Sequence, residues 1–417
     1  MGAGVTENIE HKRLDCGIEL AVLPLAGRPV VAVEIRILAG YAFERPEYLG
    51  VAHVLDEAIV KGTAKRDGRA LNDAFDAIGA THSSYAGRER FGFSCLCLPE
   101  FLERAVALHA EMIRTPSFPP EDCAVAVELT SQTLAALEDD PQELAKKLLH
   151  RQAYGEPLGR HPLGEEETLE RIGREQILDH WQRYFCAARM QVAVAGAVEP
   201  AAVADLFERE FEGFRRGEPD LDGLGFQFNA ARSHHEKDLE QEQIAICFPG
   251  PAAQDEDFPT AQVIVGLLAG GMGARLFTEV REKQGLVYWV GAWSDQSRRS
   301  GMFHLGASTT PQNLEKTYTT LLREIDRLSE DLTTEEVERA IAGIVIRNQT
   351  RGDITRARAV ELTEDLFYHG RPIPTEEKMA RVQAVTIQRI CDYLAGHPRD
   401  RLSVVTLGPT PEKSDAL

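Results

Sequence analysis

The chain has 417 residues, which is enough for two or three domains that each bury a core of their own. Hydrophobic residues make up 43% and charged residues 27%, the balance of an ordinary globular protein. The 66 acidic side chains outnumber the 46 basic ones, and the formal net charge of −20 argues against nucleic acid or an anionic membrane as the main partner.

Targeting signals and disulfides are not expected. The sequence has no apolar signal region and no apolar run of membrane length. Its seven cysteines are spread thinly without a CxxC pair, and Cys95 and Cys97 alternate on a predicted strand. These features predict buried free thiols in a reducing compartment, and therefore a cytoplasmic protein.

The first half of the chain mixes predicted hairpins with amphipathic helices. Strand patterns flank a turn at Gly27, and a second hairpin is expected about Gly87. Pro99 and Pro119 stand where the first turn of a helix tolerates proline. The predicted strands are 14–25, 30–38, 80–85, 90–98 and 190–197. The predicted helices are 49–62, 69–78, 99–113, 119–137, 142–153, 174–184 and 200–210.

The first of these helices has two different faces. Ala52, Leu55 and Ile59 recur every three or four residues and can face a core. Gly62 stops the helix.

Its other face carries His53 and Glu57, four residues apart, with Asp56 beside them. A histidine followed by an acid three residues later and a ligand-capable residue four later is the geometry of a zinc-peptidase helix. On spacing alone, the same three residues also fit a solvated surface.

The second half repeats the first after a segment rich in Gly, Pro and charge. We expect an N-terminal domain over 1–213, a linker over 214–233 and a C-terminal domain over 234–417. In both halves a helix closed by glycine precedes two strands and a proline-initiated helix, at an offset of about 210 residues. The predicted elements are strands 243–247, 286–293 and 302–309, and helices 259–268, 275–284, 311–328 and 333–347. This order predicts an α+β fold of two homologous halves, each a mainly antiparallel sheet with helices on one side.

Two stretches resemble the pitrilysin/insulinase metallopeptidase family. That family has an inverted zinc motif, His-Phe-Leu-Glu-His, followed by Lys-Gly-Thr, and this chain has His-Val-Leu-Asp-Glu at 53–57 and Lys-Gly-Thr at 61–63. The stretch Gly-Gly-Met-Gly-Ala-Arg-Leu-Phe-Thr-Glu-Val-Arg-Glu-Lys-Gln-Gly-Leu-Val-Tyr at 270–288 is close to a C-terminal block of the same family. The resemblance covers nearly the whole chain, and it implies two α+β halves that face each other across a cavity.

The resemblance also implies a degenerate zinc site in this chain. Asp56 stands where the family has its general base Glu, and Glu57 stands where it has its second ligand His. Thr133 occupies the position of the third ligand Glu, and Ala126 that of a helper acid. A hydrolytic zinc ion needs three protein ligands and a base. His53 is therefore interpreted as a vestigial or packing histidine, with a metal ligand as the alternative.

Two acidic neighbours could in principle replace the missing ligand. Glu128 and Glu138 each lie five residues from Thr133, which is roughly 140° around a helix, so neither points to the same place.

The C-terminal block retains Arg281 and Tyr288, which in the family hold the substrate backbone and polarise the scissile carbonyl. Taken alone, the two residues would be a surface charge and a core aromatic. The resemblance implies a non-catalytic subunit of a heterodimeric zinc peptidase, similar to a bacterial two-subunit member. Its partner would be a related chain that carries the zinc, its substrate a peptide, and this chain would hold no cofactor of its own. The alternatives are an active zinc metallopeptidase that uses His53 and Glu57, or a purely structural pseudopeptidase.

Overall fold

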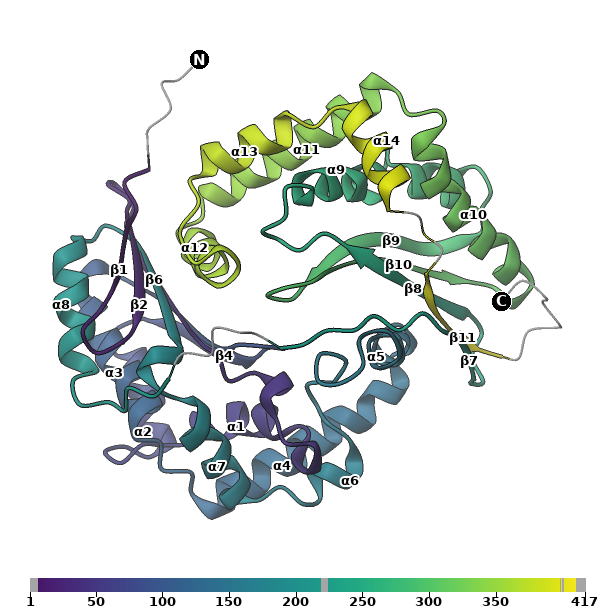
Figure 1. Ribbon diagram of the computed structural model, residues 1–417. Helices are drawn as coiled ribbons and strands as arrows, with labels where there is room; N and C mark the ends of the chain where they lie inside the picture. The colour runs from purple at the N-terminus through teal and green to yellow at the C-terminus, as the bar shows by residue number, and fades with distance from the viewer. Residues whose placement is uncertain (1–6, 219–223, 398, 400, 410–417) are drawn as a thin grey trace. The chain divides into compact units, whose positions relative to one another are not determined.

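The computed structural model describes residues 7–218, 224–397, 399 and 401–409. Contacts divide the chain into two compact units. The first unit contains the described residues of Met1–Ala136, Arg160–Gly223 and Arg351–Thr375. The second contains those of Leu137–Gly159, Leu224–Thr350 and Glu376–Leu417. Each unit holds one β-sheet (Figure 1).

The sheet of the first unit has six strands in the order β1-β2-β6-β3-β5-β4. Their bounds are β1 (Glu10–Arg13), β2 (Glu19–Pro24), β3 (Val31–Ile37), β4 (Thr81–Ala86), β5 (Phe91–Cys97) and β6 (Met190–Gly196). Only the β2–β6 pair is parallel among these. Every residue of the central strands β3 and β6 is buried, because both faces of the sheet are covered.

One face of this sheet packs on the main core of the unit, and the other is covered by a helix from far along the chain. The main core combines apolar strand residues with residues from most helices of the unit. On the opposite face, Leu362 and Leu366 of α12 pack on alanines of β3 and β6. The helices are α1 (Val51–Ile59), α2 (Gly68–Asp76), α3 (Leu102–Arg114), α4 (Pro120–Ala136), α6 (Glu166–Leu169), α7 (Arg174–Tyr184), α8 (Pro200–Glu210) and α12 (Thr355–His369).

The sheet of the second unit has five strands in the order β7-β11-β8-β10-β9. Their bounds are β7 (Arg232–Glu236), β8 (Glu242–Gly250), β9 (Val287–Gln296), β10 (Gly301–Thr309) and β11 (Ser403–Gly408). One face of this sheet packs against helices that follow β8 in the sequence, and the apolar residues between them form the core of the unit. Helix α5, which precedes the sheet in the sequence, contacts β8 and β11. The helices are α5 (Pro141–Tyr154), α9 (Phe258–Ala269), α10 (Leu314–Asp326), α11 (Thr334–Gly352), α13 (Thr375–Gln383) and α14 (Ile387–Gly396).

The two sheets share one topology, which supports the predicted internal repeat. In each, a parallel pair (β2–β6 or β7–β11) is followed by three antiparallel neighbours in the same order. The predicted α+β class is confirmed. One difference is that each unit takes one helix, α12 or α5, from the other half of the sequence.

The boundaries predicted from sequence do not anticipate this exchange of helices. The predicted limits at 213 and 234 remain predictions, and residues 219–223 of the expected linker lie outside the described residues. β7 begins at Arg232, within that linker. All seven cysteines are free, as expected, and five of them are buried. Among the described helices, none is both long and apolar enough to cross a membrane.

Candidate functional site

Helix α1 is positioned at its N-terminus by a buried acid that precedes it. Glu44 accepts hydrogen bonds from the backbone N–H groups of Gly50 (2.8 Å) and Ala52 (2.7 Å). These are donors that a helix start leaves without partners, and a carboxylate there also complements the helix dipole. Gly50 has a φ of +98°, a conformation that favours glycine. These backbone contacts therefore fix where α1 begins and the direction in which the chain enters it.

The core face of α1 is as the sequence predicts. Ala52, Leu55 and Ile59 have no exposed surface, and the helix contacts α4, α7 and β4. Helix α1 ends at Ile59, and Gly62 follows with a φ of +150°. The burial of this face sets the rotation of α1, and with it the direction of His53, Asp56 and Glu57.

Those three side chains are half-buried on the other face, beside the edge strand β4. Burial raises the pKa of Asp56 to about 6; a hydrogen bond from Ser84 of β4 opposes this rise and the charge of Glu57 adds to it. Burial lowers the pKa of His53, and Glu57 partly offsets that change. At neutral pH this face therefore presents a neutral imidazole together with the carboxyl groups of Asp56 and Glu57.

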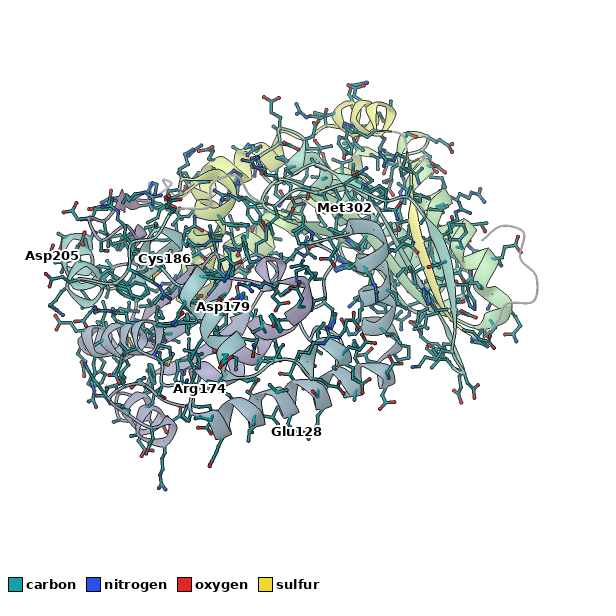
Figure 2. All side chains as sticks on the ribbon, turned by 60° about the horizontal axis from the view of Figure 1, so that its bottom comes forward. Glu128, Arg174, Asp179, Cys186, Asp205 and Met302 are labelled. Atoms are coloured by element: carbon teal, nitrogen blue, oxygen red, sulfur yellow. The ribbon has the colours of Figure 1, made fainter. Side chains whose placement is uncertain are left out.

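The fourth predicted site residue, Thr133, lies on the neighbouring helix α4 and is exposed. Its Oγ1 donates a hydrogen bond to the Leu129 carbonyl oxygen at 2.8 Å, within its own helix. Ala126 is fully buried in the core. Glu128 is exposed on α4 (Figure 2), and Glu138 pairs with Lys237 at 2.5 Å in the second unit.

In the second unit, Arg281 lies on a short π-helix, η6 (Phe277–Glu282), where the sequence predicts an ordinary helix over 275–284. The Lys283 N–H donates to the Thr278 carbonyl oxygen at 2.9 Å, five residues back. π-helical turns are rare in proteins, and those that occur often lie at functional sites. The Arg281 side chain is exposed, and its guanidinium lies 5.1 Å from the centre of the Phe277 ring.

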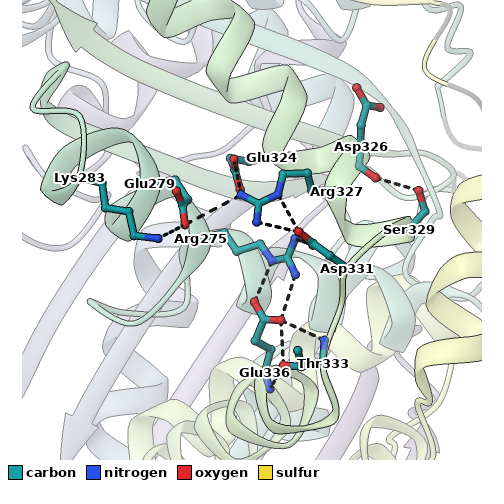
Figure 3. A network of polar contacts seen from close by, with 10 residues as sticks. All are labelled: Arg275, Glu279, Lys283, Glu324, Asp326, Arg327, Ser329, Asp331, Thr333 and Glu336. Carbon is teal, nitrogen blue, oxygen red and sulfur yellow. Dashed lines mark hydrogen bonds and ion pairs between the residues drawn. The ribbon is translucent and has the colours of Figure 1, made fainter.

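Arg275, just before this π-helix, is held by a network of ion pairs (Figure 3). Its guanidinium donates to both carboxylate oxygens of Glu336, at 2.8 and 3.0 Å, and to Asp331 at 2.7 Å. Only 8% of the Arg275 side chain is exposed, so these bonds are poorly screened by water. They tie the start of the turn to α11.

The π-helix is also held directly. Glu279 lies 2.7 Å from the Lys283 amine and 3.9 Å from the guanidinium of Arg327 (Figure 3). Arg327 in turn pairs with Glu324 of α10 and with Asp331. The backbone that carries Arg281 is thus tied to two helices.

Tyr288 lies at a β-bulge at the start of β9, the edge strand of its sheet. Ser308 pairs with Trp289 and Thr309 with Val287, so Tyr288 is the extra residue between two ladder positions. A bulge re-aims a side chain, and Tyr288 is 76% exposed. Because β9 and η6 are in contact, Arg281 and Tyr288 lie on adjacent elements of one unit.

Comparisons with known proteins match nearly the whole chain. A family model described as insulinase (peptidase family M16) matches residues 22–166, and one described as the peptidase M16 inactive domain matches residues 171–344. The chain belongs to the pitrilysin/insulinase family.

Relatives of this M16 chain are named as zinc proteases or as part of a processing peptidase. An uncharacterized zinc protease of Rickettsia felis is 29% identical over 89% of this chain and 91% of its own length. An uncharacterized zinc protease of Bacillus subtilis is 25% identical over 86% and 88%. A probable mitochondrial-processing peptidase subunit beta of Arabidopsis thaliana is 24% identical over 96% and 78%.

Solved structures show the same M16 fold. The peptidase M16 inactive domain from Pseudomonas fluorescens has a TM-score of 0.89 at 20% identity, covering 98% of this chain and all of that one. A protease from Helicobacter pylori also has a TM-score of 0.89, at 16% identity, covering 97% and 100%.

The donors around α1 do not fit the hydrolytic zinc ion that the M16 family implies. Such an ion takes three protein ligands and a water, and the donors of His53, Asp56 and Glu57 do not converge on one point as a group of three. Among the described residues, no third His, Cys, Asp or Glu joins His53 and Glu57 in a group that could hold a metal. Sequence reasoning named these positions but missed Ser84, the residue of distant β4 that hydrogen-bonds Asp56.

Proposed function

We propose that this chain is the non-catalytic subunit of a two-chain zinc metallopeptidase. In this proposal a related subunit holds the zinc, and Arg281 and Tyr288 of this chain bind the peptide at that zinc site. The observation that carries the proposal is a contrast. Tyr288 is presented by a bulge and Arg281 by a braced π-helix, while α1 lacks a third ligand.

The chemistry of the two exposed side chains suits a peptide bond under attack. A guanidinium and a phenol are directional donors, and both can hydrogen-bond a carbonyl oxygen as it gains negative charge. A tyrosine that is 76% exposed contributes little to a core, and its hydroxyl at the bulge is accessible to a bound peptide. The ion pairs around η6 would hold the backbone that carries Arg281.

Peptide as the substrate is supported by an edge strand in each unit. β4 ends the first sheet and alternates between exposed and half-buried residues, and β9 ends the second. An edge strand offers unpaired backbone groups to an extended peptide, which gains main-chain hydrogen bonds by joining the sheet.

A two-chain assembly is supported by the family and by one relative. The Arabidopsis relative is named as a subunit of a processing peptidase. If a related chain carries an intact His-x-x-Glu-His helix, this chain needs no zinc at α1. We place the complex in the cytoplasm, with no role for nucleic acid or membrane.

A second candidate is an active metallopeptidase that uses His53 and Glu57. The observation in its favour is the pKa of Asp56, raised to about 6, because a general base works best when its pKa is near the operating pH. It would need a ligand that α4 does not offer at Thr133. A purely structural pseudopeptidase is the third possibility.

The test is a peptidase assay of each chain alone and of the two together. The partner is the related chain from the same organism that has an intact His-x-x-Glu-His motif. Arg281→Ala or Tyr288→Phe should cut turnover by the assembled pair by about a hundred- to a thousand-fold, the usual effect of removing one donor to a developing oxyanion. Glu282→Gln, at an exposed neighbour of Arg281, is the matched control and should leave turnover unchanged.

Three results separate the candidates. The proposal holds if only the pair is active and the two variants lose turnover while still assembling. Unchanged turnover in assembled variant pairs would replace it with the structural role. Chelator-sensitive turnover by this chain alone would establish the second candidate.

A further inference from the structure

A group of metal-binding side chains lies in the second unit, away from the residues described above. His150 of α5, Asp295 of β9 and His304 of β10 each bring a ligand atom to within 4.8 Å of the other two. The His304 side chain has no exposed surface, and that of Asp295 is 22% exposed. Nothing in the proposed function uses these residues.

We propose that His150, Asp295 and His304 bind one divalent transition-metal ion, with zinc as the expected occupant. Two imidazoles and one carboxylate are a donor set that suits zinc and related first-row ions, whereas magnesium and calcium prefer oxygen ligands alone. Tetrahedral zinc with bonds of about 2.0–2.1 Å holds its ligand atoms roughly 3.4 Å apart. The three side chains therefore need only small rotations to close on an ion.

The surroundings orient two of the three donors. Tyr154, one turn beyond His150 on α5, donates from its hydroxyl to Asp295 Oδ2 at 2.6 Å. The same hydroxyl lies 2.9 Å from Nε2 of His304. The Trp293 ring stacks on the His304 ring, with centroids 5.3 Å apart and planes 11° apart. Contacts of this kind hold the side chains in place before an ion arrives. An ion bound at Nε2 of His304 and Oδ2 of Asp295 would displace the Tyr154 hydroxyl from between them or take it as a further ligand.

The position of the group suggests what an ion would do. Helix α5 belongs to the second unit by its contacts, although the sequence places it in the first half of the chain. His150 is the ligand on that helix, and the other two lie on neighbouring strands of the sheet. A bound ion would fasten α5 to the sheet and stabilise the folded chain, because the unfolded chain does not bring the three ligands together.

The experiment is zinc binding by the full chain after treatment with a chelator and removal of any affinity tag. We expect one zinc ion per chain by calorimetry, and a rise in Tm of several degrees when zinc is added. Added Co²⁺ should give the absorption bands of a four- or five-coordinate site and quench tryptophan fluorescence, because Trp293 stacks on a ligand.

Two ligand variants and one control locate the site. His150→Gln and Asp295→Asn should each weaken zinc binding more than about 100-fold, the upper range for loss of an outer hydrogen bond. His53→Gln should bind zinc as the parent does. Circular dichroism checks that each variant is folded, and the more exposed Asp295 gives a usable variant if His150→Gln is unstable.

The outcomes distinguish this site from the zinc motif of α1. Zinc lost from the His150 and Asp295 variants but kept by His53→Gln supports the inference. No stoichiometric binding, with no change in Tm, would mean that the group is a hydrogen-bonded network only, and would overturn it. Zinc lost only from His53→Gln would overturn it too, and would also contradict the proposed function.

Discussion

At the scale of single residues, His53 and Glu57 can each bind a metal, yet no third ligand accompanies them among the described residues. Two ligands on one helix hold zinc weakly. We therefore predict that His53→Ala leaves the zinc content of the purified chain unchanged and does not lower turnover by the assembled pair. Elemental analysis after dialysis, with the peptidase assay alongside, checks both. One zinc per chain that disappears in His53→Ala would place the metal at α1 and remove the basis of the proposed division of labour.

Glu242 gives a prediction about pH. The residue is fully buried, and neither of its carboxylate oxygens has a hydrogen-bond partner among the residues that the structure describes. Burial raises its pKa from 4.5 to about 7. The folded state therefore holds the proton more tightly than the unfolded state. The contribution of this carboxyl to stability is fully present below about pH 4.5, and it is lost as the pH rises through about 7.

Removing the charge at Glu242 should thus stabilise the protein only at the higher pH. At pH 8, Glu242→Gln should raise the free energy of unfolding by up to about 3 kcal/mol, and near pH 4 the difference should vanish. Urea unfolding at both pH values measures this, and Glu240→Gln at an exposed site is the control. An equal difference between variant and parent at both pH values would mean that folding does not raise the pKa of Glu242.

What the sequence could predict about these residues depended on whether the cause was local. The buried positions Ala52, Leu55 and Ile59 follow from helical spacing, and the structure confirms them. The hydrogen bond between Asp56 and Ser84 joins elements that are far apart in sequence, and its effect on the pKa of Asp56 could not be predicted. The burial of Glu242 likewise depends on strands that pair only in the folded sheet.

At the scale of elements, the ion pairs around η6 make a specific prediction. Arg275→Gln leaves the Glu336 carboxylate without its cation and removes one of the two arginines that pair with Asp331, and should lower the free energy of unfolding by about 2 kcal/mol. Turnover by the assembled pair should also fall, because η6 carries Arg281. Lys283→Gln, whose side chain is 61% exposed, should cost less than about 0.5 kcal/mol.

Urea unfolding and the peptidase assay measure the two effects separately. Equal losses of stability in Arg275→Gln and Lys283→Gln would mean that the network does not hold the turn. A stable Arg275→Gln variant with normal turnover would mean that Arg281 needs no such support.

The elements near Arg281 and Tyr288 also mark a limit of sequence reasoning. A helix over 275–284 was predicted, but the pattern of apolar residues does not separate α-helical from π-helical bonding. The bulge at Tyr288 arises from pairing with β10, so β9 alone does not reveal it. The importance of Arg281 and Tyr288 in this block stays a prediction from the resemblance, while the way the two side chains are presented depends on tertiary structure.

At the scale of the whole molecule, two helices pack in a different unit from the one that their position in the sequence suggests. The predicted repeat agrees with the matching strand orders of the two sheets. The exchange of α5 and α12 was not predicted, because a helix with one apolar face does not reveal which sheet it will cover. Each exchanged helix covers sheet surface formed by the other half of the sequence.

This exchange predicts how the chain behaves when it is cut at the predicted linker. A fragment of residues 1–213 keeps strands β1–β6 but lacks α12, so the alanines that Leu362 and Leu366 cover would be exposed. We expect the fragment to bind a hydrophobic dye and to melt without a sharp transition. A peptide of residues 351–375, marginal as an isolated helix, should bind it, reduce dye binding and sharpen the melt.

The matched control is the same peptide with Leu362→Asp and Leu366→Asp, which should not bind because burying two unpaired carboxylates opposes contact with an apolar surface. Dye fluorescence, calorimetry and peptide titration measure the three states. The fragment of residues 1–213 could instead melt sharply at the temperature of the intact chain and not bind the peptide. That result would mean that the first unit does not need α12 for its stability. The first sheet would then be stabilised by one face alone, and the exchange of helices would serve assembly of the intact chain and not the stability of each unit.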